Sequence, residues 1–153
     1  MSYLERVRAL QAWEPSAYRP FIADRRRVGL IHRDFIPHLA DFSAVFHVSE
    51  ADVALAPGLG DAASRTAAMA EVLAELRSRD LIPGWRNEPY AVCEDWGTPP
   101  LFQMERAAVP LFGTLGYGVH LNGFVRDGGE IKMWVGKRSM TKPTGPGKLD
   151  QLV

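Results

Sequence analysis

"GVHLNGFVRDGGEIKMWVGKRSMTKPTGPGKLDQLV", residues 118–153, closes this chain of 153 residues with two runs of alternating apolar and polar side chains. Alternate side chains of a β-strand point to opposite faces, so each run predicts a strand with one apolar face. The apolar residues are Val119, Leu121 and Val125 in the first run and Ile131, Met133 and Val135 in the second. Between the runs, RDGGE supplies a tight turn that tolerates left-handed backbone. The sequence therefore predicts a β-hairpin.

The other face of this hairpin, together with the turn after it, carries polar, aromatic and basic side chains. They are His120, Asn122, Trp134, Lys137, Arg138, Lys142 and Lys148. Guanidinium and ammonium groups bind phosphate oxygens, and an indole ring stacks on a flat ring that imidazole and amide groups can hydrogen-bond. These residue types are compatible with a substrate-binding surface. The alternative from the residues alone is a solvent-exposed sheet face followed by a basic loop.

The residues before the hairpin predict several short elements. A helix is expected over 2–13, strands over 21–23 and 28–31 around a charged turn, and a second hairpin from the runs 45–48 and 53–56. Asp34 is expected to cap one helical turn that ends at Ala40. The basic turn DRRRVG, residues 24–29, is read as a solvent-exposed loop, with a phosphate site as the alternative.

The clearest helix is predicted over 62–79. Asp61 stands at its N-cap position, and Pro83 and Gly84 follow its end. Its apolar stripe consists of Met69, Val72, Leu73 and Leu76. Two further runs, EPYAVCED (88–95) and PPLFQMERAAVPLF (99–112), are read as strands, with Cys93 buried as a small hydrophobic residue. The change of pattern near 110–115 places a boundary between a domain of residues 1–112 and one of residues 113–153.

Composition excludes several classes of protein and site. Eighteen Lys and Arg balance eighteen Asp and Glu, so the sequence indicates no nucleic-acid partner, and no apolar run is long enough to cross a membrane. The single cysteine excludes an internal disulfide and indicates a reducing, cytoplasmic compartment. The four histidines lie in different predicted elements without ligand spacing, so no metal site is expected.

The quoted stretch, above all GVHLNG, MWVGKRS and PGKLDQLV, resembles the opening of the Nudix hydrolase domain. The subgroup that it resembles is related to the Nudix part of fungal thiamin pyrophosphokinase and carries an N-terminal domain of unknown function. FIADRRRVGLIHRDF (21–35) and ERAAVPLFG (105–113) fit that N-terminal domain, so the resemblance covers the whole chain. It implies an α+β fold: a small N-terminal α+β domain, followed by the first strands of an incomplete α/β/α Nudix sandwich.

Nudix chemistry depends on the pattern G-x5-E-x7-R-E-U-x-E-E-x-G-U, where U is aliphatic and the glutamates hold Mg²⁺ or Mn²⁺. The resemblance places this box just after KLDQLV, where the given sequence stops. Glu71 and Glu75 lie four residues apart but lack the Arg-Glu and Glu-Glu dipeptides of the box. We therefore expect no catalytic residue and no bound metal in this truncated chain, and we expect the chain by itself to be inactive.

The resemblance implies the N-terminal portion of a pyrophosphohydrolase that acts on a small diphosphate, with thiamin diphosphate or an analogue as the indicated substrate. Whether the chain is itself an enzyme is left open. The alternative is a non-catalytic module for ligand binding or dimerisation, because the N-terminal domain has its own predicted helix and strands. Nucleic-acid binding through Arg25–Arg27 and the terminal lysines is a weaker third option, which zero net charge disfavours.

Overall fold

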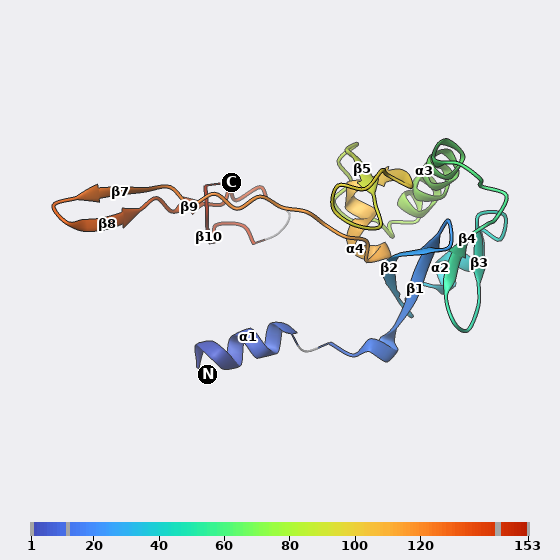
Figure 1. The fold of residues 1–153 in the computed structure, drawn as a ribbon, viewed down its shortest axis with the longest axis horizontal. Coiled ribbons are helices and arrows are strands. Elements are labelled where there is room, and N and C mark those ends of the chain that lie inside the picture. Colours follow the sequence, from blue (N-terminus) through green and yellow to red (C-terminus); the bar gives the residue numbers. More distant parts are fainter. Residues whose placement is uncertain (1, 12, 143–144, 153) are drawn as a thin grey trace. The chain divides into compact units, whose positions relative to one another are not determined.

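A computed structural model describes residues 2–11, 13–142 and 145–152. The chain divides into two compact units, Met1–Gly116 and Tyr117–Val153, which we call unit 1 and unit 2 and treat separately (Figure 1). The described residues combine helices with several small sheets, so the predicted α+β class is confirmed. None of the helices in the described ranges is both long and apolar enough to span a bilayer.

Unit 1 is built on a four-stranded sheet in the order β2-β1-β4-β3 (Figure 1). The strands are β1 Tyr18–Ala23, β2 Arg26–His32, β3 Phe46–Val48 and β4 Val53–Leu55. β1 runs parallel to β4, whereas the β1–β2 and β3–β4 pairs are antiparallel. Both predicted strand pairs of this region are therefore confirmed.

Three described helices of unit 1 lie in its first 78 residues: α1 Tyr3–Gln11, α2 Pro37–Ala40 and α3 Ala62–Ser78, with a 3-10 turn at Pro15–Ala17. The prediction that Asp34 caps the short helix is wrong. Ile36 occupies the N-cap of α2 and makes no side-chain cap bond, while the Asp34 carboxylate lies 3.5 Å from Nδ1 of His32. α1 exposes its first apolar side chains, Tyr3 and Leu4, to solvent.

α3 begins as predicted. The Asp61 carboxylate accepts a hydrogen bond from the Ser64 backbone N–H over 2.7 Å, and the Ser64 hydroxyl accepts one from the Asp61 N–H over 3.3 Å. This reciprocal pair satisfies N–H groups that have no partner inside the helix. The predicted stripe faces the core, and its four members, Met69, Val72, Leu73 and Leu76, are all buried.

A second, two-stranded sheet consists of β5 Pro89–Val92 and β6 Phe102–Glu105. The prediction that the β6 run continues as a strand to Phe112 is wrong, because a 3-10 turn over Arg106–Ala108 leads into helix α4 Val109–Phe112. Pro110 stands in the first turn of α4, where its missing N–H costs nothing. Cys93 is half-buried rather than buried, since it lies just beyond the end of β5.

Aromatic rings join the elements of unit 1 in one core. The Phe112 ring from α4 lies 5.3 Å from that of Phe21 in β1 and 6.1 Å from that of Phe46 in β3, measured between centroids. Backbone also packs closely here: the Leu30 N–H donates to the Gly113 carbonyl over 3.3 Å. A Cβ at Gly29 would stand 2.3 Å from the Phe112 carbonyl oxygen, so this contact requires glycine.

Unit 2 contains the predicted hairpin, formed by β7 Phe124–Asp127 and β8 Glu130–Met133. Gly128 and Gly129 adopt φ angles of 57° and 91°, as a two-residue turn of this kind requires. The first predicted run begins at Val119, but residues 119–123 form no strand and β7 begins only at Phe124. Both hairpin strands are exposed on both faces, including Phe124, Ile131 and Met133. Such a hairpin lacks the covering layer that apolar strand faces normally have.

Candidate functional site

The predicted basic turn is enclosed by a short antiparallel pair of strands in unit 2. β9 Gly136–Lys137 pairs with β10 Leu149–Asp150, in a register that places Lys137 opposite Leu149. The Arg138 N–H then donates to the Lys148 carbonyl over 2.9 Å. This pairing places the predicted residues Lys137, Arg138 and Lys148 at the base of one turn, although they are separated along the chain.

Arg138 and Lys148 flank Gly145 within this turn. A Cβ at Gly145 would lie 3.4 Å from Cδ of Lys148 and 3.7 Å from Nε of Arg138. Lys142 belongs to the same turn, where its N–H donates to the Ser139 carbonyl over 3.2 Å. The structure thus brings two of the predicted cationic side chains together and keeps a third on the intervening loop.

An acidic residue that the sequence reasoning missed orients the guanidinium. Nη1 of Arg138 donates to Oδ2 of Asp150 over 2.5 Å, and the Arg138 side chain is 29% exposed. This hydrogen bond and a second one from the Gln151 backbone N–H lower the pKa of Asp150 below its ordinary value. Asp150 is the one acidic residue within 136–152, against four basic residues. The turn therefore keeps an excess of positive charge, which favours an anionic ligand.

His120 lies beside the strand that carries Asp150. A ring nitrogen of His120, Nδ1, forms a hydrogen bond with the Gln151 side-chain amide, and the Leu152 N–H donates to the Leu121 carbonyl over 3.1 Å. His120 also contributes, as the smallest cause, to the lowered pKa of Asp150. No local pattern pointed to Gln151, because its contact with His120 spans 31 positions of the chain.

Trp134 and Asn122 stand at the open end of the β7–β8 hairpin. The backbone N–H of Trp134 donates to the carbonyl of Gly123 over 2.8 Å, and Gly123 directly follows Asn122 in the chain. Trp134 is 62% exposed, and Asn122 is also exposed. All seven predicted residues thus lie in unit 2, where His120 approaches β10, Trp134 pairs with the residue after Asn122, and the basic residues surround the turn.

The residues present do not fit the divalent metal that Nudix chemistry uses. Within residues 2–11, 13–142 and 145–152, no group of three or more His, Cys, Asp or Glu side chains is arranged to hold a metal ion. Mg²⁺ and Mn²⁺ need several oxygen ligands around one point. Unit 2 instead carries four basic side chains around one turn and the exposed Trp134.

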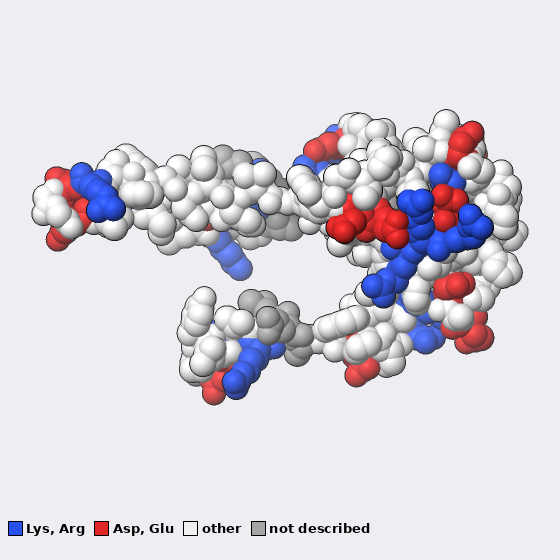
Figure 2. Space-filling view, in the orientation of Figure 1, with Lys and Arg blue, Asp and Glu red and all other residues white. Residues whose placement is uncertain are grey.

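Charge on the larger part of the molecule is mixed. Figure 2 shows basic and acidic side chains next to one another over the sheet region of unit 1. The basic turn after β1 follows this pattern, since Arg26 lies 3.2 Å from the carboxylate of Glu94. A face of alternating sign does not present the continuous positive stripe typical of nucleic-acid-binding proteins.

Comparison with known proteins finds a matching family and several relatives of this chain. A family model described as "Domain of unknown function (DUF4743)" matches residues 2–116, which is unit 1 without its first residue. Nudix hydrolase 24, chloroplastic, of Arabidopsis thaliana is 43% identical over 88% of this chain and 37% of its own length. Nudix hydrolase 20, chloroplastic, of the same plant is 41% identical over 88% of the chain and 38% of its own length.

A third relative, an uncharacterised protein of Saccharomyces cerevisiae, is 41% identical over 47% of the chain and 21% of its own length. The chain thus spans 37% and 38% of the length of the two plant relatives. The alignment with each plant relative covers 88% of the chain, which is more than residues 2–116 make up, so it includes part of unit 2. The chain belongs to the DUF4743 family, whose domain it shares with Nudix hydrolases.

Proposed function

We propose that this chain is the N-terminal portion of a Nudix-type pyrophosphohydrolase that cleaves a diphosphate linkage in a small molecule. The observation that carries the proposal is the 43% identity to a Nudix hydrolase over 88% of the chain. We take thiamin diphosphate or an analogue as the substrate, on the resemblance of residues 118–153 to the Nudix part of thiamin pyrophosphokinase. Residues 113–153 are then the first strands of the catalytic domain.

In this proposal, unit 2 supplies the substrate side of the site. Arg138, Lys137, Lys142 and Lys148 contact phosphate oxygens, because charge-assisted bonds from guanidinium and ammonium groups are the strongest that a side chain can offer a phosphate. Asp150 holds the Arg138 guanidinium in place until a phosphate displaces it. The exposed Trp134 ring stacks on the organic ring of the substrate, and His120 and Asn122 hydrogen-bond it.

The metal belongs to the complete protein in this proposal. A bound Mg²⁺ or Mn²⁺ would polarise the diphosphate and activate water. The described residues do not fit such an ion, so the chain by itself binds substrate without turning it over. We further propose a reducing, cytoplasmic location from the single cysteine, and no nucleic-acid partner from the balanced charge.

The test is a calorimetric titration of the 153-residue chain with thiamin diphosphate, thiamin monophosphate and thiamin. We expect affinity to fall in that order, because each phosphate removed takes away contacts to the basic turn. Arg138→Ala should weaken diphosphate binding by roughly tenfold or more, the effect of losing one charge-assisted hydrogen bond. Arg126→Ala is the matched control, since Arg126 is an exposed arginine of β7 outside the turn.

A parallel assay follows phosphate release from thiamin diphosphate in the presence of Mg²⁺ or Mn²⁺. We expect no release above the uncatalysed rate. Metal-dependent turnover by the purified chain would overturn the proposal that it is inactive alone. If the chain dimerises in analytical ultracentrifugation without ligand and binds no diphosphate, the non-catalytic dimerisation module becomes the better description.

A further inference from the structure

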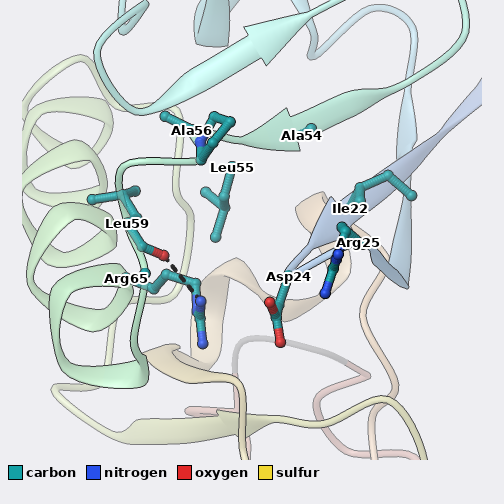
Figure 3. Close-up of a pocket in the computed structure, with 10 residues that line it drawn as sticks. Ile22, Asp24, Arg25, Ala54, Leu55, Ala56, Leu59 and Arg65 are labelled. Atoms are coloured by element: carbon teal, nitrogen blue, oxygen red, sulfur yellow. Dashed lines mark hydrogen bonds between the residues drawn. The ribbon is translucent and has the colours of Figure 1, made fainter.

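A pocket of about 280 Å³ opens in unit 1 between the β1–β2 turn, the end of β4 and the start of α3 (Figure 3). It lies outside the basic turn of unit 2 and none of the residues discussed for diphosphate binding lines it. One wall is apolar and consists of Ile22, Ala54, Leu55 and Leu59. Charged side chains complete the lining: Arg65 from α3, with Asp24 and Arg25 from the turn. A pocket that combines an apolar wall with a few charges is typical of small-molecule sites.

Arg65 is the unusual member of this lining, because it is a buried cation. Its side chain is 6% exposed, and among the described residues no other Lys or Arg is buried. Nε donates to the Leu101 carbonyl over 2.9 Å and Nη1 to the Leu59 carbonyl over 3.0 Å, so two neutral acceptors fix the plane of the guanidinium. A buried charge is costly unless an opposite charge compensates it.

No carboxylate of the described residues lies within ion-pair distance of Arg65, and none of their atoms accepts a hydrogen bond from its Nη2. Asp61 is near enough for Arg65 to contribute, as the smallest cause, to the lowered pKa of Asp61, but that carboxylate is engaged in capping α3. Figure 3 shows the Arg65 guanidinium beside the pocket, and its Nη2 has no acceptor among the residues that the structure describes. It is oriented before any ligand arrives, which lowers the entropic cost of binding one.

The opposite side of the pocket carries a carboxylate, that of Asp24, with no ion-pair partner in the described part of the chain. Asp24 and Arg25 form the two-residue turn between β1 and β2, and both adopt left-handed backbone, with φ angles of 51° and 63°. Neither side chain forms an ion pair with a described residue. Figure 3 shows the Asp24 carboxylate and the Arg65 guanidinium reaching the pocket from the turn and from the helix. The pocket thus holds a fixed cation, an opposing anion and a hydrocarbon wall.

We infer that this pocket binds a small zwitterion with an aliphatic body, the chemistry of a free aliphatic α-amino acid. The ligand's carboxylate pairs with the Arg65 guanidinium, whose planar donors match a carboxylate. Its ammonium group faces Asp24, and its side chain packs on Ile22, Leu55 and Leu59. A phosphate dianion fits less well, because the Asp24 carboxylate on the rim repels it. Arg25 adds a second cation at the mouth of the pocket.

The experiment titrates the 153-residue chain with four probes and follows heat and backbone amide shifts. The probes are L-leucine, L-leucinamide, 4-methylpentanoate and inorganic phosphate. We expect leucine to bind saturably and to shift amides of residues 22–25 and 54–65. The amide probe lacks the carboxylate and 4-methylpentanoate lacks the ammonium group, so each should bind roughly tenfold more weakly. Equal affinity of leucine and leucinamide, or saturable binding of phosphate alone, would overturn the ligand class.

Variants test the two charges of the pocket separately. Asp24→Asn keeps a residue that tolerates left-handed backbone and should weaken leucine binding, while leaving the binding of 4-methylpentanoate unchanged. Arg27→Gln is the control, because Arg27 is exposed and does not line this pocket. Arg65→Gln should abolish binding of both carboxylates, with circular dichroism confirming that the variant folds. If leucine binds Asp24→Asn as it binds the parent, or binds neither, the inference is wrong.

The outcome is independent of the proposed hydrolase function. Thiamin diphosphate binding is expected to depend on Arg138 in unit 2 and leucine binding on Arg65 and Asp24 in unit 1. If the chain binds leucine but not thiamin diphosphate, the proposed function fails and this inference stands. If it binds thiamin diphosphate but not leucine, the reverse holds.

Discussion

Arg138 and Asp150 join the two strands that enclose the basic turn: Nη1 of Arg138 donates to Oδ2 of Asp150 over 2.5 Å, and the residues that precede them, Lys137 and Leu149, are opposite one another in the β9–β10 pair. The carboxylate restrains a guanidinium that would otherwise sample many rotamers. It also occupies donors that a phosphate group would use. In the proposed function, a phosphate group that binds at this turn therefore takes the place of the Asp150 carboxylate.

Asp150→Asn is expected to retain diphosphate binding and to tighten it, because a neutral amide competes less with phosphate for Arg138. The measurement is the dissociation constant for thiamin diphosphate by calorimetry, with Arg138→Ala beside it. Retention of affinity in Asp150→Asn with loss in Arg138→Ala assigns the binding to the guanidinium. Equal loss in both variants would instead show that the pair only maintains the fold of the turn.

The pKa of the Asp150 carboxyl should lie below its ordinary value of 3.8, because Arg138 and the Gln151 backbone N–H both stabilise the charged form. Since the folded pKa is the lower one, this group contributes stability above its unfolded pKa and loses it as the pH falls through the folded value. Carbon-13 chemical shifts of the Asp150 side chain, followed from pH 6 down to pH 2, measure the midpoint. In Arg138→Ala the midpoint should rise, and an unchanged midpoint would contradict the assignment of the cause.

Gly29→Ala should destabilise unit 1 strongly, because its new Cβ would lie 2.3 Å from the Phe112 carbonyl oxygen, and backbone cannot yield as a flexible side chain can. We expect a loss of about 2–4 kcal/mol in the free energy of unfolding by urea denaturation. Gly58→Ala is the control, because nothing lies within 4 Å of the added methyl group and its φ is not left-handed. A loss of similar size in both variants would show that the close approach is not the reason.

Asp61→Ala should lower the free energy of unfolding at pH 7, because α3 loses its reciprocal cap with Ser64. The same bonds lower the pKa of Asp61 below 3.8, with the Ser64 backbone N–H as the first cause. The contribution is present above the ordinary pKa and disappears as the pH falls through the folded value. Urea midpoints of parent and variant should therefore converge at low pH. A difference that does not depend on pH would point to a role other than the cap.

Much of unit 1 could be predicted because its signals are local. The α3 helix follows from Asp61 at the N-cap and from a stripe that repeats every three or four positions. The β3–β4 hairpin of unit 1 and the β7–β8 hairpin of unit 2 follow from alternating runs around short turns. Such patterns are complete within about 20 residues, so no knowledge of distant contacts is needed.

The features that sequence analysis mispredicted or overlooked depend instead on contacts between residues far apart in the chain. VPLF at 109–112 has the composition of a strand, but its helical conformation is stabilised by burial of Phe112 against Phe21 and Phe46, which lie far away in the chain. Asp150 shows no pattern of its own, and only the β9–β10 register brings it to Arg138. Arg65 did leave a trace, because it falls on the buried stripe of α3 four positions before Met69. A charged residue in line with a core stripe is a signal that sequence reasoning can use.

The hydrogen bond from Leu30 to the Gly113 carbonyl has a consequence for how the DUF4743 domain is handled in isolation. β2 is an outer strand of the four-stranded sheet, and the Leu30 N–H would otherwise be open to another chain. The Gly113 carbonyl thus occupies a donor at that edge to which a strand of another chain could pair. A laboratory truncation should therefore end after Gly116, because a cut at Phe112 would leave the Leu30 N–H at the sheet edge without this acceptor.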